Sequence, residues 1–194
     1  MEVHIFLFDD FDTMDAFGPA EVLGNVPEHF HINYVSIDGK IVNSMQGIKV
    51  WTEPLNPETV KGIFIVPGGR GARRLLYQET ETLDKLKKSI AHAEICAMVS
   101  EGAAMVSQTG HLFRRKIAEC KVGENWKRMF LAGVYEVPGA SWVADGKYYS
   151  ASNAFSSLAM TLSILADLTD LDVAEAAAGQ IGCAWDAEDE TVYR

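Results

Sequence analysis

The chain reads as short apolar runs that alternate with longer segments of helical spacing. Apolar runs rich in β-branched and aromatic residues predict strands at Val3–Phe8, His31–Ile37, Gly62–Val66, Ala93–Val99 and Tyr135–Val137. Apolar residues recurring at helical spacing predict helices at Met14–Leu23, Thr80–His92, Glu101–Gln108, Ala154–Leu168 and Leu171–Ile181. The order of these segments is the first guide to the fold.

Strands that alternate with helices are typical of a parallel sheet with helices on both faces. Gly62–Val66 and Ala93–Val99 are almost wholly apolar, as strands covered on both faces must be. The turn signal Asp145-Gly146 adds a small β-hairpin between Trp142 and Ser150. We therefore expect an α/β protein with a flavodoxin-like three-layer α/β/α sandwich. Because no linker-like segment divides the chain, one domain is expected over residues 1–194.

Charge and hydropathy narrow the set of partners. A formal net charge of −10 argues against nucleic acid or an anionic membrane, since both need a concentrated positive face. No apolar run approaches the roughly 18 residues that a membrane span requires. The N-terminal segment reads as a core strand and not as a signal peptide, so a cytoplasmic location is expected.

The cysteines give no sign of a disulfide framework or a metal knuckle. Cys96, Cys120 and Cys183 are too few and too scattered for either arrangement. Cys96 lies inside an apolar run and is expected to be a buried structural thiol. We expect neither a metal nor another cofactor.

The candidate chemistry lies where strands end, because ligands gather outside the carboxyl ends of strands in open α/β sheets. Ser100 joins the strand Ala93–Val99 to a helix, the position of a nucleophile on a tight strand-to-helix turn. A serine before a helix is also a common N-cap. Asp15 follows the first strand and is either a capping acid or a pocket residue.

The third strand end carries the glycine-rich loop Gly68-Gly69-Arg70-Gly71. Glycines let backbone N–H groups approach a developing negative charge, although such a loop is as often a simple turn. Its spacing matches neither the dinucleotide fingerprint nor a phosphate loop. None of the five histidines falls at a strand end that faces these residues.

Taken together, these motifs resemble the ThiJ/PfpI superfamily, whose fold is similar to that of class I glutamine amidotransferases. The resemblance is greatest to the branch with isonitrile hydratase and the sensor domains of some AraC-type regulators. It covers almost the whole chain and rests on the segments Asp15-Ala16-Phe17-Gly18-Pro19-Ala20-Glu21-Val22-Leu23, Val66-Pro67-Gly68-Gly69-Arg70-Gly71, Val99-Ser100-Glu101-Gly102-Ala103 and Trp142-Val143-Ala144-Asp145-Gly146-Lys147.

The resemblance implies roles for particular positions. In this branch the elbow usually reads Val-Cys-Thr-Gly, with a reactive cysteine beside an acid and an oxyanion hole of backbone amides. By position, Ser100 replaces the cysteine, Glu101 replaces the threonine and Asp15 is the retained acid. The resemblance places the remaining pocket residues at Gly68, Gly69, Arg70, Gly71, Gly102 and Cys120.

Several family positions have changed together. The stretch Ile117-Ala118-Glu119-Cys120 stands where Ala-Thr-Thr-His commonly supplies a pocket histidine, and Ala159 replaces an aspartate. A serine hydroxyl needs a base, and an ordinary carboxylate of pKa about 4 is a poor one. We therefore expect a homodimeric small-molecule-binding protein with a degenerate nucleophile site, catalytically weak or inactive.

Alternative interpretations remain open. The protein is an isonitrile hydratase-like lyase or an amidase-type hydrolase if Ser100 reacts with help from Asp15 and a Gly68-Gly69 oxyanion hole. Cys120 is a candidate replacement thiol. Arg70 either pairs with an acid of the pocket, binds a ligand carboxylate, or is solvated.

A purely structural role is favoured if side chains such as Phe155, Met98 or Trp126 fill the pocket. A transcriptional regulator is not expected, because no basic helix-turn-helix segment follows the domain.

Overall fold

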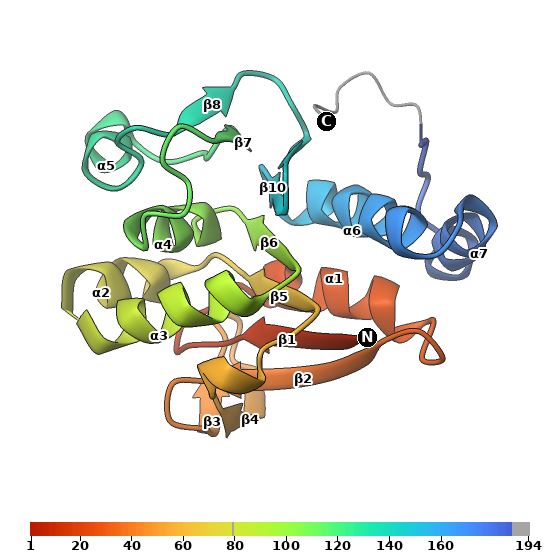
Figure 1. The fold of residues 1–194 in the computed structure, drawn as a ribbon, viewed down its shortest axis with the longest axis horizontal. Coiled ribbons are helices and arrows are strands. Elements are labelled where there is room, and N and C mark those ends of the chain that lie inside the picture. Colours follow the sequence, from red (N-terminus) through yellow and green to blue (C-terminus); the bar gives the residue numbers. More distant parts are fainter. Residues whose placement is uncertain (79, 188–194) are drawn as a thin grey trace.

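The computed structural model describes residues 1–78 and 80–187, and its centre is an eight-stranded sheet. Across the sheet the strands are β3 (Lys40–Asn43), β4 (Lys49–Pro54), β2 (His31–Ser36), β1 (Glu2–Phe6), β5 (Ile63–Val66), β6 (Ile95–Val99), β10 (Tyr148–Ala151) and β9 (Trp142–Asp145) (Figure 1). The ladders from β4 through β2, β1, β5 and β6 to β10 are parallel, whereas β3–β4 and β9–β10 are antiparallel.

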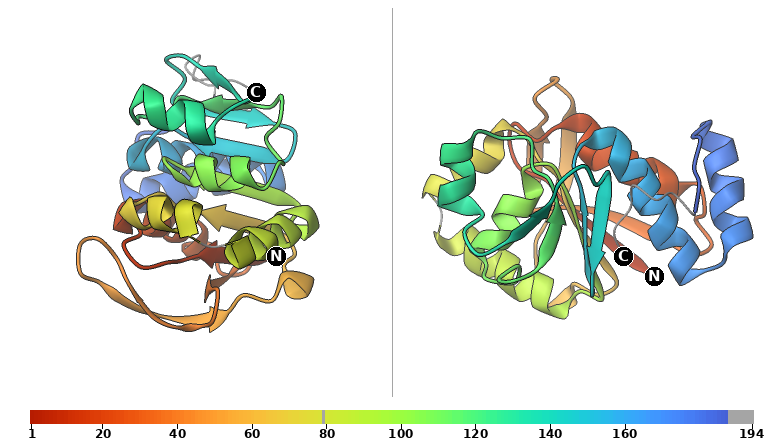
Figure 2. Two further views of the ribbon diagram at one scale, coloured as in Figure 1. Left: turned by 90° about the vertical axis from the view of Figure 1, so that its left-hand side faces the viewer. Right: turned by 90° about the horizontal axis from the view of Figure 1, so that it is seen from above.

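Helices cover both faces of this sheet. They are α1 (Thr13–Gly24), α2 (Arg70–Gln78), α3 (Thr80–His92), α4 (Gly102–Gln108), α5 (Glu124–Phe130), α6 (Ala154–Leu168) and α7 (Leu171–Ile181), with a 3-10 turn at Pro57–Thr59. Figure 2 shows α1, α6 and α7 on one side of the sheet and α2 to α5 on the other. The predicted three-layer α/β/α class is confirmed.

The central strands form where the sequence is continuously apolar. All residues of β5 and β6 are buried, and the predicted runs Gly62–Val66 and Ala93–Val99 contain these strands. The predicted hairpin is also present, as β9 and β10. Its second strand pairs in parallel with β6, so the hairpin extends the main sheet and does not stand apart from it.

The sequence analysis did not predict several of the elements. These are β3, β4, the strand β7 (Lys116–Ala118) that pairs with β8 (Tyr135–Val137), and the helices α2 and α5. The strands β3 and β4 lie at the sheet edge and are largely exposed, so they need few apolar residues. Arg70 and Gly71 belong to the first turn of α2, although their glycine-rich sequence reads as a loop.

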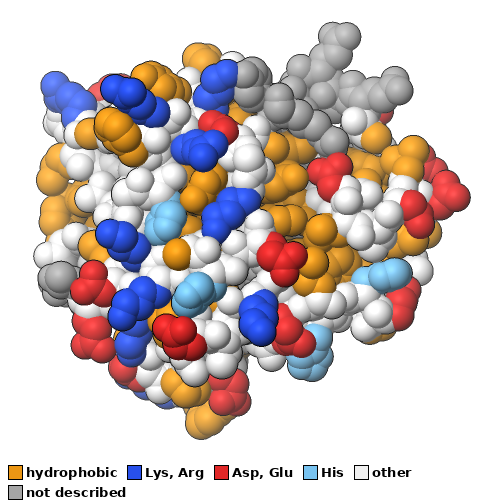
Figure 3. Space-filling model, viewed as in Figure 1, with side chains coloured by type: hydrophobic (Ala, Val, Ile, Leu, Met, Phe, Trp, Pro, Cys, Tyr) orange, Lys and Arg blue, Asp and Glu red, His pale blue; other side chains and the backbone are white. Residues whose placement is uncertain are grey.

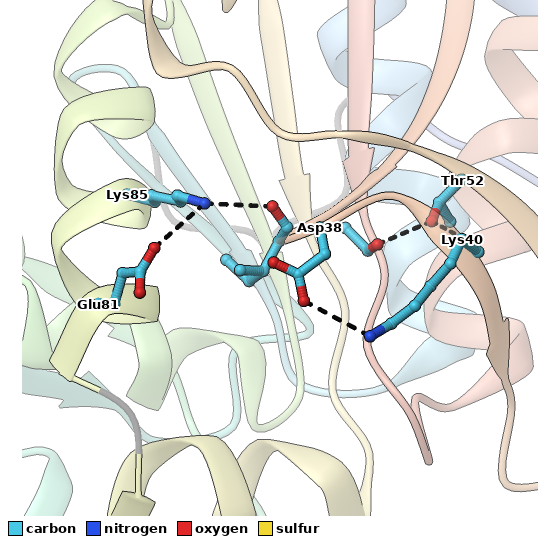
Figure 4. Close-up of polar contacts among 7 residues, drawn as sticks. Asp38, Lys40, Thr52, Glu81 and Lys85 are labelled. Atoms are coloured by element: carbon cyan, nitrogen blue, oxygen red, sulfur yellow. Dashed lines mark hydrogen bonds and ion pairs between the residues drawn. The ribbon is translucent and has the colours of Figure 1, made fainter.

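Polar contacts attach the turn between β2 and β3 to α3 (Figure 4). Lys85 of α3 donates to the Ile37 carbonyl at 3.3 Å and forms an ion pair with Glu81 at 3.4 Å. Within the turn, Lys40 and Asp38 form an exposed pair, also at 3.4 Å. Exposed ion pairs contribute little to stability, so the hydrogen bond from Lys85 to the Ile37 carbonyl is the more important of these contacts.

The surface carries charges of both signs. On the face shown in Figure 3, lysine and arginine side chains are interspersed with acidic ones and form no continuous basic area. Among the described residues, no helix is both long enough and apolar enough to cross a membrane.

Candidate functional site

Ser100 lies on a tight turn between the end of β6 and the start of α4. Its φ angle of 51° is in the left-handed region, which costs a residue with a side chain about 1–2 kcal/mol. The turn is held because the Ser100 N–H donates to the Ala151 carbonyl of β10 at 3.0 Å. The N-cap residue of α4 is Glu101, so the interpretation of Ser100 as an N-cap is wrong. The backbone instead presents Ser100 at the carboxyl end of the sheet.

Asp15 lies in the first turn of α1 and is only 3% exposed. Its Oδ2 atom accepts a hydrogen bond from the Gly68 N–H at 3.1 Å, and the Ser100 side chain interacts with the same carboxyl group and lowers its pKa. The N-cap residue of α1 is Asp12, whose side chain accepts hydrogen bonds from the Met14 and Asp15 backbone amides. Asp15 is therefore not the capping residue, although it lies in the first turn of α1, where the helix dipole favours a carboxylate, and it also lines the cavity described below.

Burial raises the pKa of Asp15 to about 7. The hydrogen bonds from Ser100 and Gly68 act in the opposite direction, while the negative charges of Asp12 and Glu101 add to the rise. A carboxyl group of this kind is a better proton acceptor near neutral pH than the ordinary aspartate expected from the sequence.

Glu101 brings a second carboxyl group to the same loop. Its Oε2 atom accepts a hydrogen bond from the Gly69 N–H at 3.4 Å. A Cβ built on Gly68 would lie 2.6 Å from this oxygen and 2.7 Å from Asp15 Oδ2. Only a glycine fits between the two carboxyl groups, so the loop residue Gly68 is fixed by its neighbours.

The other glycines predicted as pocket residues differ in what surrounds them. A Cβ on Gly71 would lie 1.8 Å from the Asp9 carbonyl oxygen, and one on Gly102 would lie 2.1 Å from the Val66 carbonyl oxygen. Both glycines permit close backbone packing, and neither lines the cavity described next. Gly69 does line it, at a φ angle of 131° that favours glycine.

A cavity of about 370 Å³ opens beside Ser100. It is lined by Asp12, Asp15, Met45, Gly69, Arg70, Ser100, Glu101, Asn153, Ala154 and Phe155. Its volume is within the range of pockets that hold small molecules. Sequence reasoning missed the walls formed by Met45, from the segment between β3 and β4, and by Ala154 at the start of α6, and it considered Phe155 only as a side chain that fills the pocket.

The cavity is not filled in the way that a purely structural role predicts. Phe155 is 80% exposed and forms part of the wall. Met98 and Trp126 are buried in the hydrophobic core and do not line the cavity. Neither does any of the five histidines, all of which lie in the described part of the chain.

Arg70 is exposed at the rim of this cavity, at the start of α2. Its backbone N–H donates to the Met45 sulfur at 3.3 Å. Within residues 1–78 and 80–187, no salt bridge joins its guanidinium to an acidic group. The interpretation in which Arg70 pairs with Glu101 or Asp15 is therefore wrong, and the guanidinium is accessible to solvent or a ligand.

Cys120 lies behind the elbow, where its thiol donates to the Ser100 carbonyl oxygen at 3.5 Å. Its own backbone N–H donates to Glu136, which in turn pairs with Lys127 at 3.1 Å. Burial raises the pKa of the Cys120 thiol to about 12, and the negative charges of Glu101 and Glu136 add to this effect. Cys120, which the sequence predicted as a pocket residue, is thus a neighbour of Ser100, but the surroundings of its thiol oppose formation of a thiolate.

The arrangement as a whole joins the hydroxyl group of a residue with a strained backbone, a carboxyl group of raised pKa and a small cavity. Among the described residues there is no group of three or more His, Cys, Asp or Glu side chains that could hold a metal ion. The chemistry available from the residues present is hydrogen bonding, charge recognition and proton transfer between Ser100 and Asp15.

The chain matches a known protein family. The family model of the DJ-1/PfpI family matches residues 1–167. Comparison with curated proteins gave no match.

Solved structures share the fold at low identity. A ThiJ/PfpI family protein from Pseudomonas syringae has a TM-score of 0.83 at 20% identity, over 97% of this chain and 77% of that one. An AraC family transcriptional regulator from Pseudomonas putida has a TM-score of 0.79 at 19% identity, over 93% and 98% of the two chains. Toxoplasma gondii DJ-1, in its oxidized form, has a TM-score of 0.76 at 19% identity, over 94% and 98%.

Proposed function

This chain belongs to the DJ-1/PfpI family, and from that premise we propose that it binds a small molecule in the cavity beside Ser100 without efficient covalent catalysis. Ser100 stands in place of the reactive cysteine of the isonitrile hydratase-like branch, to which we assign the chain. The proposal applies to one domain over residues 1–194 in the cytoplasm, as the sequence predicts.

The proposal rests on the hydrogen bonds that the Gly68 and Gly69 backbone amides make. An oxyanion hole needs N–H groups aimed at the developing negative charge. Here the Gly68 N–H donates to Asp15 and the Gly69 N–H donates to Glu101. Because both donors are engaged by carboxyl groups of the chain itself, they are poorly placed to stabilise an oxyanion formed at Ser100.

One observation favours a second candidate, a hydrolase or hydratase that uses Ser100. The Asp15 carboxyl group contacts the Ser100 side chain, and burial raises its pKa to about 7. In this candidate the Ser100 hydroxyl attacks a small carbonyl, amide or isonitrile carbon while Asp15 accepts the hydroxyl proton. For an oxyanion hole, Asp15 and Glu101 would first have to release the Gly68 and Gly69 amides.

Turnover by the wild type and by Ser100→Ala and Ser100→Cys variants tests these candidates. The panel consists of isonitriles, small amides and α-oxoaldehydes. The binding proposal predicts that the wild type is no faster than the alanine variant on any of them. Wild-type turnover that disappears in Ser100→Ala would establish the serine mechanism and reject the binding proposal. Turnover by Ser100→Cys alone would show that the site lacks only its nucleophile.

The assembly we propose is a homodimer. Large apolar side chains are exposed on the protein, including Trp51 at 68% and Phe113 at 65%. A second copy of the chain is the occupant expected to cover part of this apolar surface. Sedimentation equilibrium tests the proposal, and a monomer across the micromolar range would reject it.

A further inference from the structure

In an active elbow enzyme the amides of the glycine-rich loop form an oxyanion hole. In this chain the same amides are covered by carboxyl oxygens. Asp15 Oδ2 lies 3.1 Å from the Gly68 nitrogen, and Glu101 Oε2 lies 3.4 Å from the Gly69 nitrogen. Both N–H donors are therefore covered by oxygen atoms. At this point the wall presents hydrogen-bond acceptors to an incoming ligand, where an oxyanion hole presents donors.

The cavity is lined by more acidic than basic side chains, which also favours a ligand that donates hydrogen bonds. Asp15 comes from α1, Asp12 caps the same helix, and Glu101 precedes α4. Asp12 is already engaged, because its oxygens accept from the backbone of α1 and from the Gln46 amide. Among the described residues that line the cavity, the only cation is Arg70, which lies exposed at the rim.

Glu101 differs from Asp15 in what it can offer a ligand. It is partly exposed, and the hydrogen bond that it accepts from Gly69 is long, at 3.4 Å. Asp15 is 3% exposed and already accepts a hydrogen bond from the Gly68 N–H. Glu101 is therefore the acidic group that a ligand in the cavity reaches most readily.

We propose that Glu101 determines the specificity of this cavity, selecting small ligands with a protonated amine or amidinium head group over carboxylates. The head group donates to the Glu101 carboxylate, while an apolar body packs against Met45 and Phe155. This inference rests on the proposed function, because it requires that a small molecule enters the cavity.

Benzylammonium and benzoate are suitable probes because they share an aromatic body and carry opposite charges. Binding at pH 8 is followed by the chemical shifts of the Gly69, Ser100 and Asn153 backbone amides, which report on the cavity itself. The wild type is expected to bind benzylammonium at least tenfold more tightly than benzoate. Benzoate binding tighter than benzylammonium, through Arg70, would overturn the inference but leave the proposed function standing.

Variants of Glu101 separate its charge from its hydrogen bond. Glu101→Gln keeps an oxygen for the Gly69 N–H and is expected to lose the preference for benzylammonium. Glu101→Ala exposes the Gly69 N–H and is expected to bind benzoate more tightly than the wild type does. The matched control is Glu175→Ala, which removes the same charge from an exposed position of α7.

The outcomes have distinct meanings. An unchanged preference in both Glu101 variants would overturn the assignment of specificity to Glu101. A preference lost equally in Glu175→Ala would show an effect of net charge and would also overturn it. If neither probe shifts the cavity amides of the folded wild type, both the inference and the proposed binding function fail. Far-ultraviolet circular dichroism establishes that each variant is folded.

Discussion

The carboxyl groups of Asp15 and Glu101 accept hydrogen bonds from consecutive backbone amides of one glycine loop. The distances are 3.1 Å from the Gly68 nitrogen to Asp15 and 3.4 Å from the Gly69 nitrogen to Glu101. The two acids come from different elements, α1 and the turn before α4. Because both acids lie against Gly68, the charge of the site and its backbone geometry depend on each other. The predictions below test the two effects one at a time.

The first prediction concerns the effect of Asp15 on stability. Its pKa is raised from 3.8 to about 7 in the folded state, so the folded protein binds this proton more tightly than the unfolded chain does. The resulting stabilisation is complete below the unfolded pKa and is lost as the pH rises through about 7. Each tenfold difference in proton affinity between the two states corresponds to about 1.4 kcal/mol.

We therefore expect Asp15→Asn to raise the free energy of unfolding relative to the wild type at pH 8. This gain should shrink as the pH falls to 5, because the wild-type carboxyl group is then protonated. Urea denaturation at both pH values measures the difference. Asp84→Asn, at an exposed position of α3, is the matched control for loss of one carboxyl group. A gain that grows toward pH 5 would contradict the assignment.

The second prediction concerns backbone strain at Ser100. Its φ angle of 51° is accessible to glycine at little cost, whereas a side chain at this angle costs about 1–2 kcal/mol. Ser100→Gly and Ser100→Ala both remove the hydroxyl group. After the greater flexibility of glycine in the unfolded chain is subtracted, the glycine variant should be more stable than the alanine variant by roughly 0.5–1 kcal/mol. Equal urea midpoints would argue against strain at the turn.

The third prediction concerns close packing at Gly102. A Cβ at this position would lie 2.1 Å from the Val66 carbonyl oxygen, and β5 has no room to move within the sheet. Gly102→Ala should therefore lower the free energy of unfolding by roughly 2 kcal/mol or more, in the range of overpacked core positions. Gly179→Ala is the control, since a Cβ at this helical position meets nothing within 4 Å. That control should be neutral or stabilising by up to about 1 kcal/mol.

The fourth prediction concerns thiol reactivity. Burial raises the pKa of both Cys96 and Cys120 to about 12, whereas Cys183 is partly exposed. In the native protein at pH 8, a disulfide reagent should therefore modify Cys183 first and the other two slowly. Cys183→Ser should abolish the fast phase, and denaturant should make the remaining thiols reactive. A fast phase that survives this substitution and disappears in Cys120→Ser would show that the site thiol is accessible.

The sequence was a sufficient guide to the layers of the fold. The continuous apolar runs of β5 and β6 can be satisfied only by burial on both faces, so their position follows from composition alone. The motif at Ser100 was located for a similar reason, because an apolar strand followed by small helical residues leaves one polar residue at the join. The resemblance to a known family added the expectation that Asp15 faces this residue.

The amino-acid sequence by itself determined the layer order, the elbow at Ser100 and the three strand ends that meet there. Periodicity is a local property, and a short window of residues is enough to read it. Only the tertiary structure decided that Asp15 has a pKa of about 7, that Glu101 covers the Gly69 amide and that Phe155 lines a cavity. These properties depend on burial and on contacts between segments far apart in the chain, which no local pattern encodes.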